Sequence, residues 1–380
     1  MISFNINMVR EFSVEVPSSY SDDDYMKDCP TYNKIPTILP ASERIIAIGD
    51  IHGDLDLAIE SFRIAGLIDD NLDWIADPPN TVVVQVGDQI DSCRPIPGHD
   101  CHRTNTPGDN AEDIKILKFF DEMHVKANKY GGAVYSLLGN HEIMNAEGNF
   151  EYVSYKNYHE FYHEDEERSY KGPKGRQEAF RPGGPLATNL ACSRNAVIII
   201  GSNMFIHAGI LPRLAQILPG KNMSEREKLS HINRIVRKWL LNKVIPENYK
   251  NTIVKAGSIS PFWTRIFGKI PKNESLNSEV CMTNVKQVLK IFQIGHIVVG
   301  HTPQLFTNGD GVNGTCHENG ENKLYRVDGG FSRAFKIFDD NNIVQVLEIL
   351  NDTTFNVIKG TLKSQQISSL DKINVNIREF

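Results

Sequence analysis

The sequence has no apolar run approaching the roughly 20 residues that a membrane-spanning helix needs. It also has no block of Lys or Arg, and its net charge is −6, which argues against a nucleic-acid groove. The N-terminus lacks a charged segment followed by an apolar core, so no secretory signal is visible. We therefore expect a cytoplasmic chain with neither a nucleic acid nor a membrane as partner.

Thiol motifs are missing as well. No Cys-x-x-Cys spacing occurs among the six cysteines, which are Cys29, Cys93, Cys101, Cys192, Cys281 and Cys316. A chain of this kind is expected to keep free thiols in a reducing compartment. Cys93 and Cys101 are close in sequence within one loop, which leaves a local disulfide open.

Enough apolar sequence is present for a large core, since 40% of the 380 residues are hydrophobic. This length exceeds what one compact core usually takes, so we expect one large α/β domain with insertions or two domains. We assign residues 41–360 to one domain with insertions at about 92–110 and 145–185. Residues 1–40 are polar and form a peripheral arm, and residues 361–380 form a C-terminal tail.

Three buried strands are predicted in the first half of the chain, at 45–48, 81–86 and 133–138. Each strand is followed by Gly and then by a polar residue. Helical patterns at 55–65 and 112–129 separate the strands. This β-α-β-α-β alternation predicts a parallel sheet with right-handed crossovers, so the three polar groups emerge at one edge.

The second half alternates less regularly. Strands at 196–200 and 204–206 predict a hairpin, and another strand at 297–299 precedes His301. We expect a helical insertion at 152–167 and a surface loop at 171–184.

Two polar residues follow the first strand one residue apart. Asp50 and His52 point to the same side if the chain stays extended through Ile51, because side chains alternate along a strand. Asp88 follows the second strand and has the middle position of the series, where one carboxylate can bridge two ions. Taken alone, a polar residue at a strand end is more often structural than a metal ligand.

Six compatible ligands just past buried strands are harder to attribute to chance; they are Asp50, His52, Asp88, Asn140, His207 and His301. Oxygen and imidazole donors without thiolate suit ions such as Mn, Fe or Zn. Two such ions could clamp a phosphoryl group, polarise its oxygens and lower the pKa of a bridging water.

Five motifs of the chain resemble, in order, those of calcineurin-like metallophosphoesterases. They are Gly-Asp-Ile-His-Gly at 49–53, Gly-Asp-Gln-Ile-Asp at 87–91, Gly-Asn-His-Glu at 139–142, His-Ala-Gly at 207–209 and Gly-His-Thr-Pro at 300–303. The Gly-Asn-His-Glu form indicates the phosphoprotein phosphatase branch. Further details resemble Shewanella-like protein phosphatases, namely Pro-Leu-Ala at 185–187, Phe-Trp-Thr-Arg at 262–265 and Arg-Val-Asp-Gly-Gly at 326–330.

The resemblance covers about residues 44–338 and implies an α/β fold, a central mixed β-sandwich flanked by helices. It also implies two metal ions at the C-terminal strand edge. The first would be held by Asp50, His52 and Asp88, and the second by Asp88, Asn140, His207 and His301.

The resemblance assigns three further roles. His141 would act as general acid and protonate the leaving alkoxide or phenoxide after direct attack of a metal-bound hydroxide. Asp91 would orient the His141 imidazole. Arg265 would bind phosphate oxygens through its planar guanidinium.

The sequence departs from the family pattern at one place. The family usually has Gly-Asp-x-x-Asp-Arg-Gly, whereas Ser92 and Cys93 follow Asp91 here. A phosphate-binding arginine is therefore missing from its usual position. Arg94 and Arg103 are the candidates to supply the lost charge.

We therefore expect a metal-dependent phosphatase that hydrolyses phosphomonoesters, with phosphorylated Ser, Thr or Tyr of proteins as the substrate. The alternative within enzymes is a nucleotide or dinucleoside polyphosphate hydrolase, which uses the same metal motifs. An inactive binding module on the same fold is a third reading, but such a module should lose ligands or the acid, and all are present. The acidic net charge disfavours a DNA nuclease.

Overall fold

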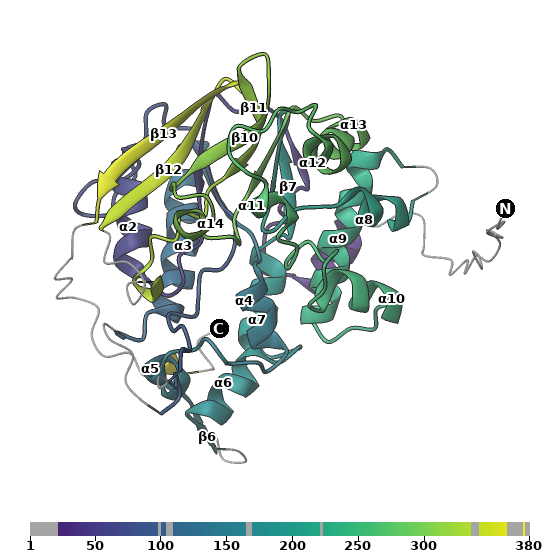
Figure 1. Ribbon diagram of the computed structural model, residues 1–380. Coiled ribbons are helices and arrows are strands. Elements are labelled where there is room, and N and C mark those ends of the chain that lie inside the picture. The colour runs from purple at the N-terminus through teal and green to yellow at the C-terminus, as the bar shows by residue number, and fades with distance from the viewer. Residues whose placement is uncertain are drawn as a thin grey trace.

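The computed structural model describes residues 22–97, 100–103, 109–164, 169–220, 223–335, 342–362 and 375–376. Two β-sheets stack on each other, with helices on their outer faces (Figure 1). The start of the predicted N-terminal arm and most of the predicted C-terminal tail lie outside the described residues. Within the described ranges, no helix is both long enough and apolar enough to cross a membrane.

The five-stranded sheet has the order β13-β12-β2-β3-β4. Its central strands β2 (Arg44–Ile48), β3 (Val82–Gln85) and β4 (Ala133–Ser136) are parallel neighbours, as the alternation predicts. Strand β12 (Ile343–Leu350) pairs antiparallel with both β2 and β13 (Thr354–Thr361), which makes the sheet mixed. The carboxyl ends of β2, β3 and β4 therefore meet at one edge.

The six-stranded sheet has the order β1-β7-β8-β9-β11-β10. Its strands are β1 (Ile38–Leu39), β7 (Val197–Ile200), β8 (Asn203–Ile206), β9 (His296–Val299), β10 (Asn313–Glu318) and β11 (Glu321–Arg326). Strands β7 and β8 form the predicted antiparallel hairpin, and β8 is parallel to β9. The ends of β8 and β9 thus point the same way.

The packing of β7 shows why this is a sandwich. Ile198 and Ile200 belong to the core that contains the five-stranded sheet, whereas Val197 and Ile199 belong to the core on the other face. Strand side chains alternate between the two faces, so an all-apolar strand must be covered on both. An apolar core covers each face of the strand, and the predicted mixed β-sandwich flanked by helices is confirmed.

Helices cover the outer faces. Helices α2 (Leu55–Ile64) and α3 (Asp113–Asn128) pack beside the five-stranded sheet, and α9 (Glu225–Leu240) packs on β7 and on α7 (Pro185–Ser193). Shorter helices complete the chain: α1 (Asp22–Asp28), α4 (Asn140–Ala146), α8 (Pro212–Ile217), α10 (Glu247–Tyr249), α11 (Ile266–Lys269), α12 (Glu279–Cys281), α13 (Gln287–Phe292) and α14 (Gln304–Thr307). Single turns of π-helix occur at Lys250–Val254 and Met282–Lys286, and a 3₁₀ turn at Arg333–Phe335.

Two local predictions about the insertion are wrong. Within its described part, residues 152–164, the segment predicted to be helical has the short helix α5 (Tyr155–His159), followed by β5 (Phe161–Glu164). Strand β5 pairs with β6 (Ser169–Lys171) and with β14 (Val375–Asn376), a long-range pairing that local periodicity cannot show.

The loop predicted at 171–184 is a helix over most of its length, α6 (Pro173–Phe180). Proline at the first helical position starts it, because Pro needs no backbone partner there. One face of α6 buries Arg176, Ala179 and Phe180. Tertiary burial thus overrides the polar, Gly-containing composition that suggested a loop.

The expectation of free thiols is also wrong. All six cysteines are among the described residues and form the disulfides Cys29–Cys192, Cys93–Cys101 and Cys281–Cys316. Their Cα–Cα distances are 5.6, 5.9 and 5.7 Å respectively, within the range that a disulfide needs. The fold brings Cys29 and Cys192 together across 163 residues, which sequence spacing cannot predict. Because disulfides persist mainly in oxidising compartments, the thiol argument for a cytoplasmic location no longer holds.

Candidate functional site

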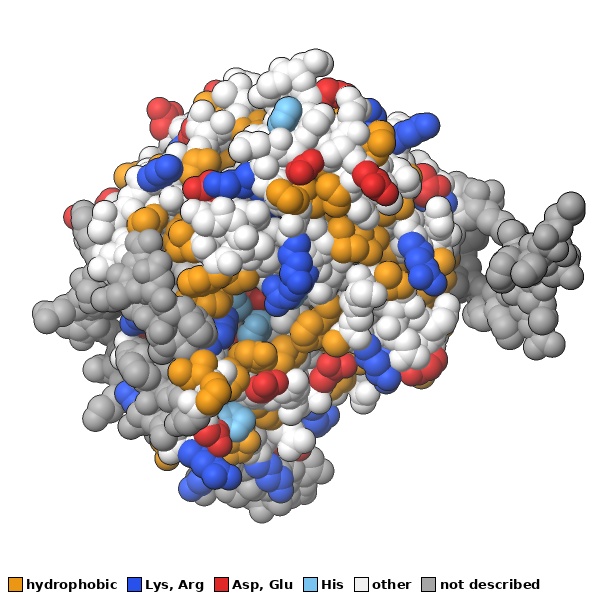
Figure 2. Space-filling view, in the orientation of Figure 1, with side chains coloured by type: hydrophobic (Ala, Val, Ile, Leu, Met, Phe, Trp, Pro, Cys, Tyr) orange, Lys and Arg blue, Asp and Glu red, His pale blue; other side chains and the backbone are white. Residues whose placement is uncertain are grey.

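The six predicted metal ligands meet where strands of both sheets end. Asp50, Asp88 and Asn140 follow β2, β3 and β4, whereas His207 and His301 follow β8 and β9. His52 and these five residues are all buried. Figure 2 shows histidine and acidic atoms recessed near the middle of one face of the molecule, with basic and hydrophobic side chains around them.

Asp88 lies at the centre of this group. Its Oδ2 atom is 3.8 Å from Nε2 of His52 and 3.4 Å from Nε2 of His207. Two overlapping sets of side chains have ligand atoms within 4.8 Å of one another, and Asp88 belongs to both. One set adds His52 and His141, and the other adds His207 and His301. This is the arrangement in which one carboxylate can contact two cations.

Two more predicted ligands border these sets. Asp50 Oδ2 is 3.8 Å from His52 Nε2, and it accepts a 3.0 Å hydrogen bond from the backbone N–H of His301. Asn140 Oδ1 is 3.0 Å from His207 Nε2. The other ring nitrogen of His207 lies 2.9 Å from the carbonyl of Val86 and donates to it, which fixes the ring with Nε2 directed at Asn140 and Asp88.

The backbone conformation between Asp50 and His52 differs from the extended one that was predicted. The chain is not extended after Asp50, because His52 has φ 47°. Asp88, Asp91 and His301 also have positive φ. Such a conformation costs a non-Gly residue about 1–3 kcal/mol and persists only where surrounding contacts impose it. Here the backbone N–H groups of Ile51 and His52 both donate to the carbonyl of Asp88 at 2.9 Å.

Glycine is required where the chain packs directly on the carboxylates. A Cβ atom on Gly139 would lie 2.2 Å from Oδ1 of Asp88, and one on Gly300 would lie 2.2 Å from Oδ1 of Asp50. Any larger residue would therefore displace a carboxylate. The glycines that precede Asn140 and His301 in the motifs allow strands from both sheets to converge on the same acids.

Glu142 is a functional residue that we did not single out from the sequence, although it ends the Gly-Asn-His-Glu motif. Its buried carboxylate accepts hydrogen bonds from the N–H groups of Gly139 at 2.7 Å, Gln89 at 2.8 Å and Asp88 at 3.0 Å. Glu142 therefore ties the loop after β3 to the loop after β4. Its bond to the N–H of Gly139, three residues earlier, is the glutamate half of a capping box, and an acid at the third position of a helix is the local signal for it.

The titratable groups of the site differ in how readily they adopt the forms that bind cations. Burial raises the pKa of Asp50 well above its usual range, and the neighbouring carboxylates of Asp328 and Asp88 raise it further. Burial also lowers the pKa of His52 and His301 well below the usual range, so both imidazoles are neutral at pH 7. Neutral imidazole and carboxylate are the forms that bind metal ions.

Asp88 behaves in the opposite way from Asp50. Burial acts to raise its pKa, but the adjacent imidazoles of His207 and His141 outweigh burial and lower the pKa well below its usual range. Asp88 is therefore ionised. Among the described residues, His52 Nδ1 and Asp328 Oδ2 are buried without a hydrogen-bond partner. A buried acidic cluster with open donor and acceptor atoms is one that bound cations would complete.

His141 and Asp91 form the predicted pair. His141 Nδ1 is 2.8 Å from Asp91 Oδ2, and both side chains are buried. The other ring nitrogen, Nε2, lies 3.9 Å from Asp88 Oδ2 and so faces the ligand cluster. The carboxylate thus holds the ring with one nitrogen directed at the site, the orientation that a general acid needs.

Arg176 contacts the Asp91 side of this pair. It was not identified from the sequence, because it lies in the segment predicted as a loop. Its side chain is fully buried, 2.8 Å from Asp113 Oδ2 and 3.4 Å from Asp91 Oδ1. Asn145 donates to both oxygens of Asp91 at 3.0 Å and accepts from Nε of Arg176 at 2.9 Å. A residue from the insertion therefore stabilises the carboxylate that orients His141.

Three arginines were named as phosphate-binding candidates, and the structure separates them. Nη1 of Arg265 donates to the carbonyl of His301 at 2.8 Å, which places Arg265 beside the site. Arg94 lies over the rings of Phe335 and Tyr152, which contact His52 and His141 respectively. Arg103 is 84% exposed and pairs with its near neighbour Asp100 at 3.2 Å, away from these contacts.

The chain matches the family model of calcineurin-like phosphoesterases over residues 43–305. This range begins just before β2 and extends past His301, so it includes every predicted site residue. The family uses a site for two metal ions, and the side chains around Asp88 could bind metal.

Three similar proteins illustrate the relationship. Uncharacterized protein R398 of Acanthamoeba polyphaga mimivirus is 56% identical over 63% of this chain and 97% of its own length. Shewanella-like protein phosphatase 2 of Arabidopsis thaliana is 28% identical over 83% of this chain and 77% of its own length. The crystal structure of a cold-active protein-tyrosine phosphatase from a psychrophilic Shewanella species has a TM-score of 0.56 at 20% identity, and the match covers 87% of this chain and 83% of that one.

The last of these similarities concerns the fold alone, because the identity is low. The family match, the two mixed sheets and the relatives named as Shewanella-like protein phosphatases together confirm the resemblance inferred from the motifs. The chain belongs to the calcineurin-like phosphoesterase family.

Proposed function

We propose that the chain is a two-metal phosphatase that hydrolyses phosphomonoesters, with phosphorylated Ser, Thr or Tyr side chains of proteins as its substrates. One observation carries this proposal. The His141–Asp91 pair, 2.8 Å apart, faces Asp88, which two sets of potential metal ligands share. A proton donor beside two adjacent cation sites is what cleavage of a P–O bond to a poor leaving group requires.

The donors fit two ions of the Mn, Fe or Zn type, because carboxylate, amide and imidazole groups are present without thiolate. Asp50, His52 and Asp88 would hold the first ion, and the second would be held by Asp88, Asn140, His207 and His301. When bound, such ions polarise phosphoryl oxygens and lower the pKa of a water molecule.

His141 also lies within reach of the first ion, but we assign it to proton transfer. Its Nδ1 is 2.8 Å from the Asp91 carboxylate, so the ring is held with Nε2 directed at the site. In this role, a proton on Nε2 would pass to the leaving alkoxide or phenoxide. Asn145 and Arg176 hold Asp91 in place, so the ring keeps its direction throughout this transfer.

Arg265 would contact the phosphoryl oxygens from the second-ion side. Its guanidinium is anchored through Nη1 to the carbonyl of His301, and the remaining N–H groups can donate to an anion. Pairing between a planar guanidinium and two phosphate oxygens gives both affinity and orientation.

The protein-phosphatase assignment is supported by what the relatives are called, namely Shewanella-like protein phosphatases and a protein-tyrosine phosphatase. The decisive assay compares metal-loaded and chelator-treated protein on phosphopeptides, on nitrophenyl phosphate and on a dinucleoside polyphosphate. We expect about two ions per chain, and we expect phosphopeptide turnover that is lost with the metal.

Other outcomes would redirect the proposal. Preference for the dinucleotide over every phosphopeptide would make the chain a nucleotide hydrolase. Bound metal without turnover of any ester would leave a binding module. Comparing phosphoserine, phosphothreonine and phosphotyrosine peptides of one sequence would define the specificity.

A further inference from the structure

We propose that Arg94, fixed in place by the Cys93–Cys101 disulfide, binds the phosphoryl group of the substrate from the side opposite Arg265. This inference rests on the proposed phosphatase function and adds a second phosphate-binding residue to it. It also decides between the two arginines that the sequence left open as candidates.

Arg94 is placed at the rim of the site by two aromatic rings. Its guanidinium lies 4.5 Å from the ring centre of Phe335 and 5.6 Å from that of Tyr152. The Phe335 ring packs edge-on against His52 at 5.5 Å, and the Tyr152 ring against His141 at 5.1 Å. The two rings that hold Arg94 therefore also contact a predicted ligand and the predicted acid.

Among the described residues, no carboxylate lies within the 4.0 Å of an ion pair with the Arg94 guanidinium, and the acids whose charges act on it from farther away are Asp88, Asp91 and Asp328. Nη1 donates to the backbone carbonyls of Asp91 at 3.0 Å and Cys93 at 2.8 Å. Arg176 and Arg333 differ, because each lies against two or more carboxylates. A partly buried cation held by neutral carbonyls has donors directed elsewhere and attracts an anion.

Arg94 and Arg265 flank the ligand cluster. The Phe335 ring under Arg94 contacts His52 of the first set of ligands, and Nη1 of Arg265 donates to the carbonyl of His301 in the second set. A positive charge next to a site for metal cations is unfavourable unless an anion lies between them. A phosphoryl group bound to the ions would be that anion on both sides.

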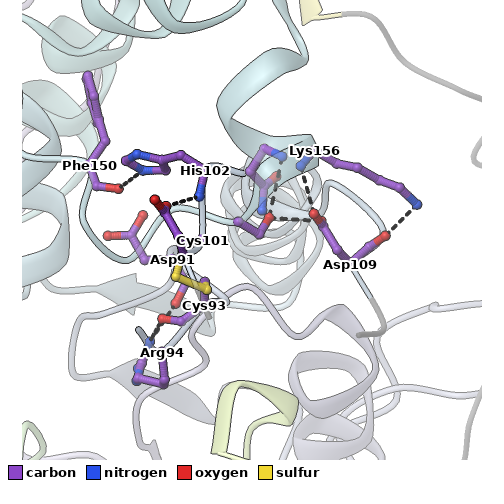
Figure 3. Close-up of a disulfide and its surroundings, with 11 residues drawn as sticks. Asp91, Cys93, Arg94, Cys101, His102, Asp109, Phe150 and Lys156 are labelled. Atoms are coloured by element: carbon purple, nitrogen blue, oxygen red, sulfur yellow. Dashed lines mark hydrogen bonds between the residues drawn. A yellow bond between two sulfur atoms is a disulfide. The ribbon is translucent and has the colours of Figure 1, made fainter. Parts of the chain in front are cut away.

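The disulfide fixes the backbone next to Arg94 (Figure 3). Both cysteines are buried, at 0% and 2% exposure, and the N–H of Cys93 donates to the carbonyl of Tyr152 at 3.0 Å. On the other side of the bridge, His102 Nε2 lies 2.6 Å from the carbonyl of Phe150. The bridge therefore holds together the two parts of the loop that are hydrogen-bonded to residues 150–152, the segment that carries Tyr152.

The place of this bridge in the sequence favours a local role. Cys93 and Cys101 are 8 residues apart, against 35 for Cys281–Cys316 and 163 for Cys29–Cys192. A short loop restricts the unfolded chain least, so this bridge should contribute least to global stability. Its effect should be to hold the Arg94 side chain ready for phosphate, which lowers the entropy lost on binding.

Arg94→Gln tests the inference in the metal-loaded full chain, with Arg103→Gln in the same loop as the matched control. We expect Arg94→Gln to lower kcat/KM for nitrophenyl phosphate by about ten- to a hundredfold, the usual range for a charge-assisted contact. Calorimetric titration should show a similar loss of affinity for inorganic phosphate, with metal content unchanged. Arg94→Lys should recover part of both losses, and Arg103→Gln should leave both unchanged.

The double variant Cys93→Ser/Cys101→Ser tests the positioning role of the bridge, with Cys281→Ser/Cys316→Ser as control. We expect the first pair to weaken phosphate binding and raise KM by about two- to tenfold with little change in Tm. The control pair should lower Tm and leave phosphate affinity as it is. A first pair that lowers only Tm would overturn the role of the bridge.

The failure of this inference differs from the failure of the proposed function. If the wild-type chain hydrolyses phosphomonoesters and Arg94→Gln and Arg94→Lys both match it in phosphate affinity and in kcat/KM, then Arg94 does not bind phosphate. If the metal-loaded wild-type chain neither binds phosphate nor cleaves any ester, the phosphatase assignment itself is wrong.

Discussion

The two sheets contribute different chemistry to the same site. The loops after β2 and β3 supply the acids Asp50 and Asp88, and helix α4 after β4 supplies Glu142, whose carboxylate accepts from backbone N–H groups of these loops. The ends of β8 and β9 supply the imidazoles of His207 and His301. The acids of the site therefore come mainly from the five-stranded sheet, and the six-stranded sheet adds the imidazoles of His207 and His301 beside them.

The two sheets also differ in how they compensate the repulsion between neighbouring carboxylates. Buried acids that lie close together lower the stability of the folded state unless cations or hydrogen bonds compensate their charges. On the five-stranded side, Glu142 accepts from backbone amides, and Arg176 lies between Asp91 and Asp113. On the six-stranded side, Arg265 is anchored to the His301 carbonyl. Substitutions on the five-stranded side (the acidic half of the site) and on the six-stranded side (the six-stranded half) should therefore affect different properties, namely metal binding, turnover, stability or phosphate binding.

The largest effect should come from the residue that the two halves share. Asp88→Asn should abolish both metal occupancy and hydrolysis, because a neutral amide bridges two cations poorly. The loss should exceed the roughly 10–100-fold cost that follows changes in groups merely supporting a ligand. Metal analysis and turnover of nitrophenyl phosphate measure it, with Asp70→Asn, a fully exposed site, as control. Two tightly bound ions and near-normal turnover in Asp88→Asn would end the bridging assignment.

His141→Asn should lower turnover without lowering metal binding. We expect metal to be retained and kcat to fall by about 10²–10⁴-fold, the scale of a lost general acid. The fall should shrink for nitrophenyl phosphate relative to alkyl phosphates, because nitrophenolate leaves without protonation. His317→Asn, at an exposed position, is the control. Equal losses for the two kinds of ester would remove His141 from the acid role.

Arg176→Met should reveal how far the acidic half depends on its buried cation. The change leaves Asp91 and Asp113 without their shared partner, so we expect a loss of about 3–5 kcal/mol in the free energy of unfolding. Urea denaturation measures the loss, and Arg181→Met, which breaks a surface pair with Glu178, is the control. A change below about 1 kcal/mol would show that neighbouring groups already compensate the two acids.

Arg265→Ala should give the smallest effect, and it concerns the six-stranded half. We expect kcat/KM to fall by about ten- to a hundredfold through weaker phosphate binding, without loss of metal or stability. Inhibition by inorganic phosphate should weaken in parallel, and Lys269→Ala in α11 is the control. If Arg265→Ala lost metal instead, the assignment of Arg265 to phosphate binding alone would be wrong.

Much of the site could be predicted from the sequence because its ligands follow regular elements. Strand, Gly and polar residue recur three times with helices between them, and right-handed crossovers then bring the strand ends together. This logic placed Asp50, Asp88 and Asn140 at one edge, where the structure has them. It succeeded although the chain turns at His52 with φ 47°, because sheet topology, and not local extension, sets the position of the loop.

Contacts between distant segments were decided only by the tertiary structure. No local pattern indicates that Cys29 meets Cys192, that Arg176 reaches Asp91, or that Arg94 lies at the site whereas Arg103 does not. Periodicity reports which face of an element is apolar, whereas the partner of a charge or a thiol depends on how elements pack. For this chain, the sequence by itself therefore determined the family, the parallel pairing of β2–β4 and the position of Asp50, Asp88 and Asn140 at one edge, because these depend on motifs, local periodicity and topology. The disulfides and the cations around the site were decided by packing alone.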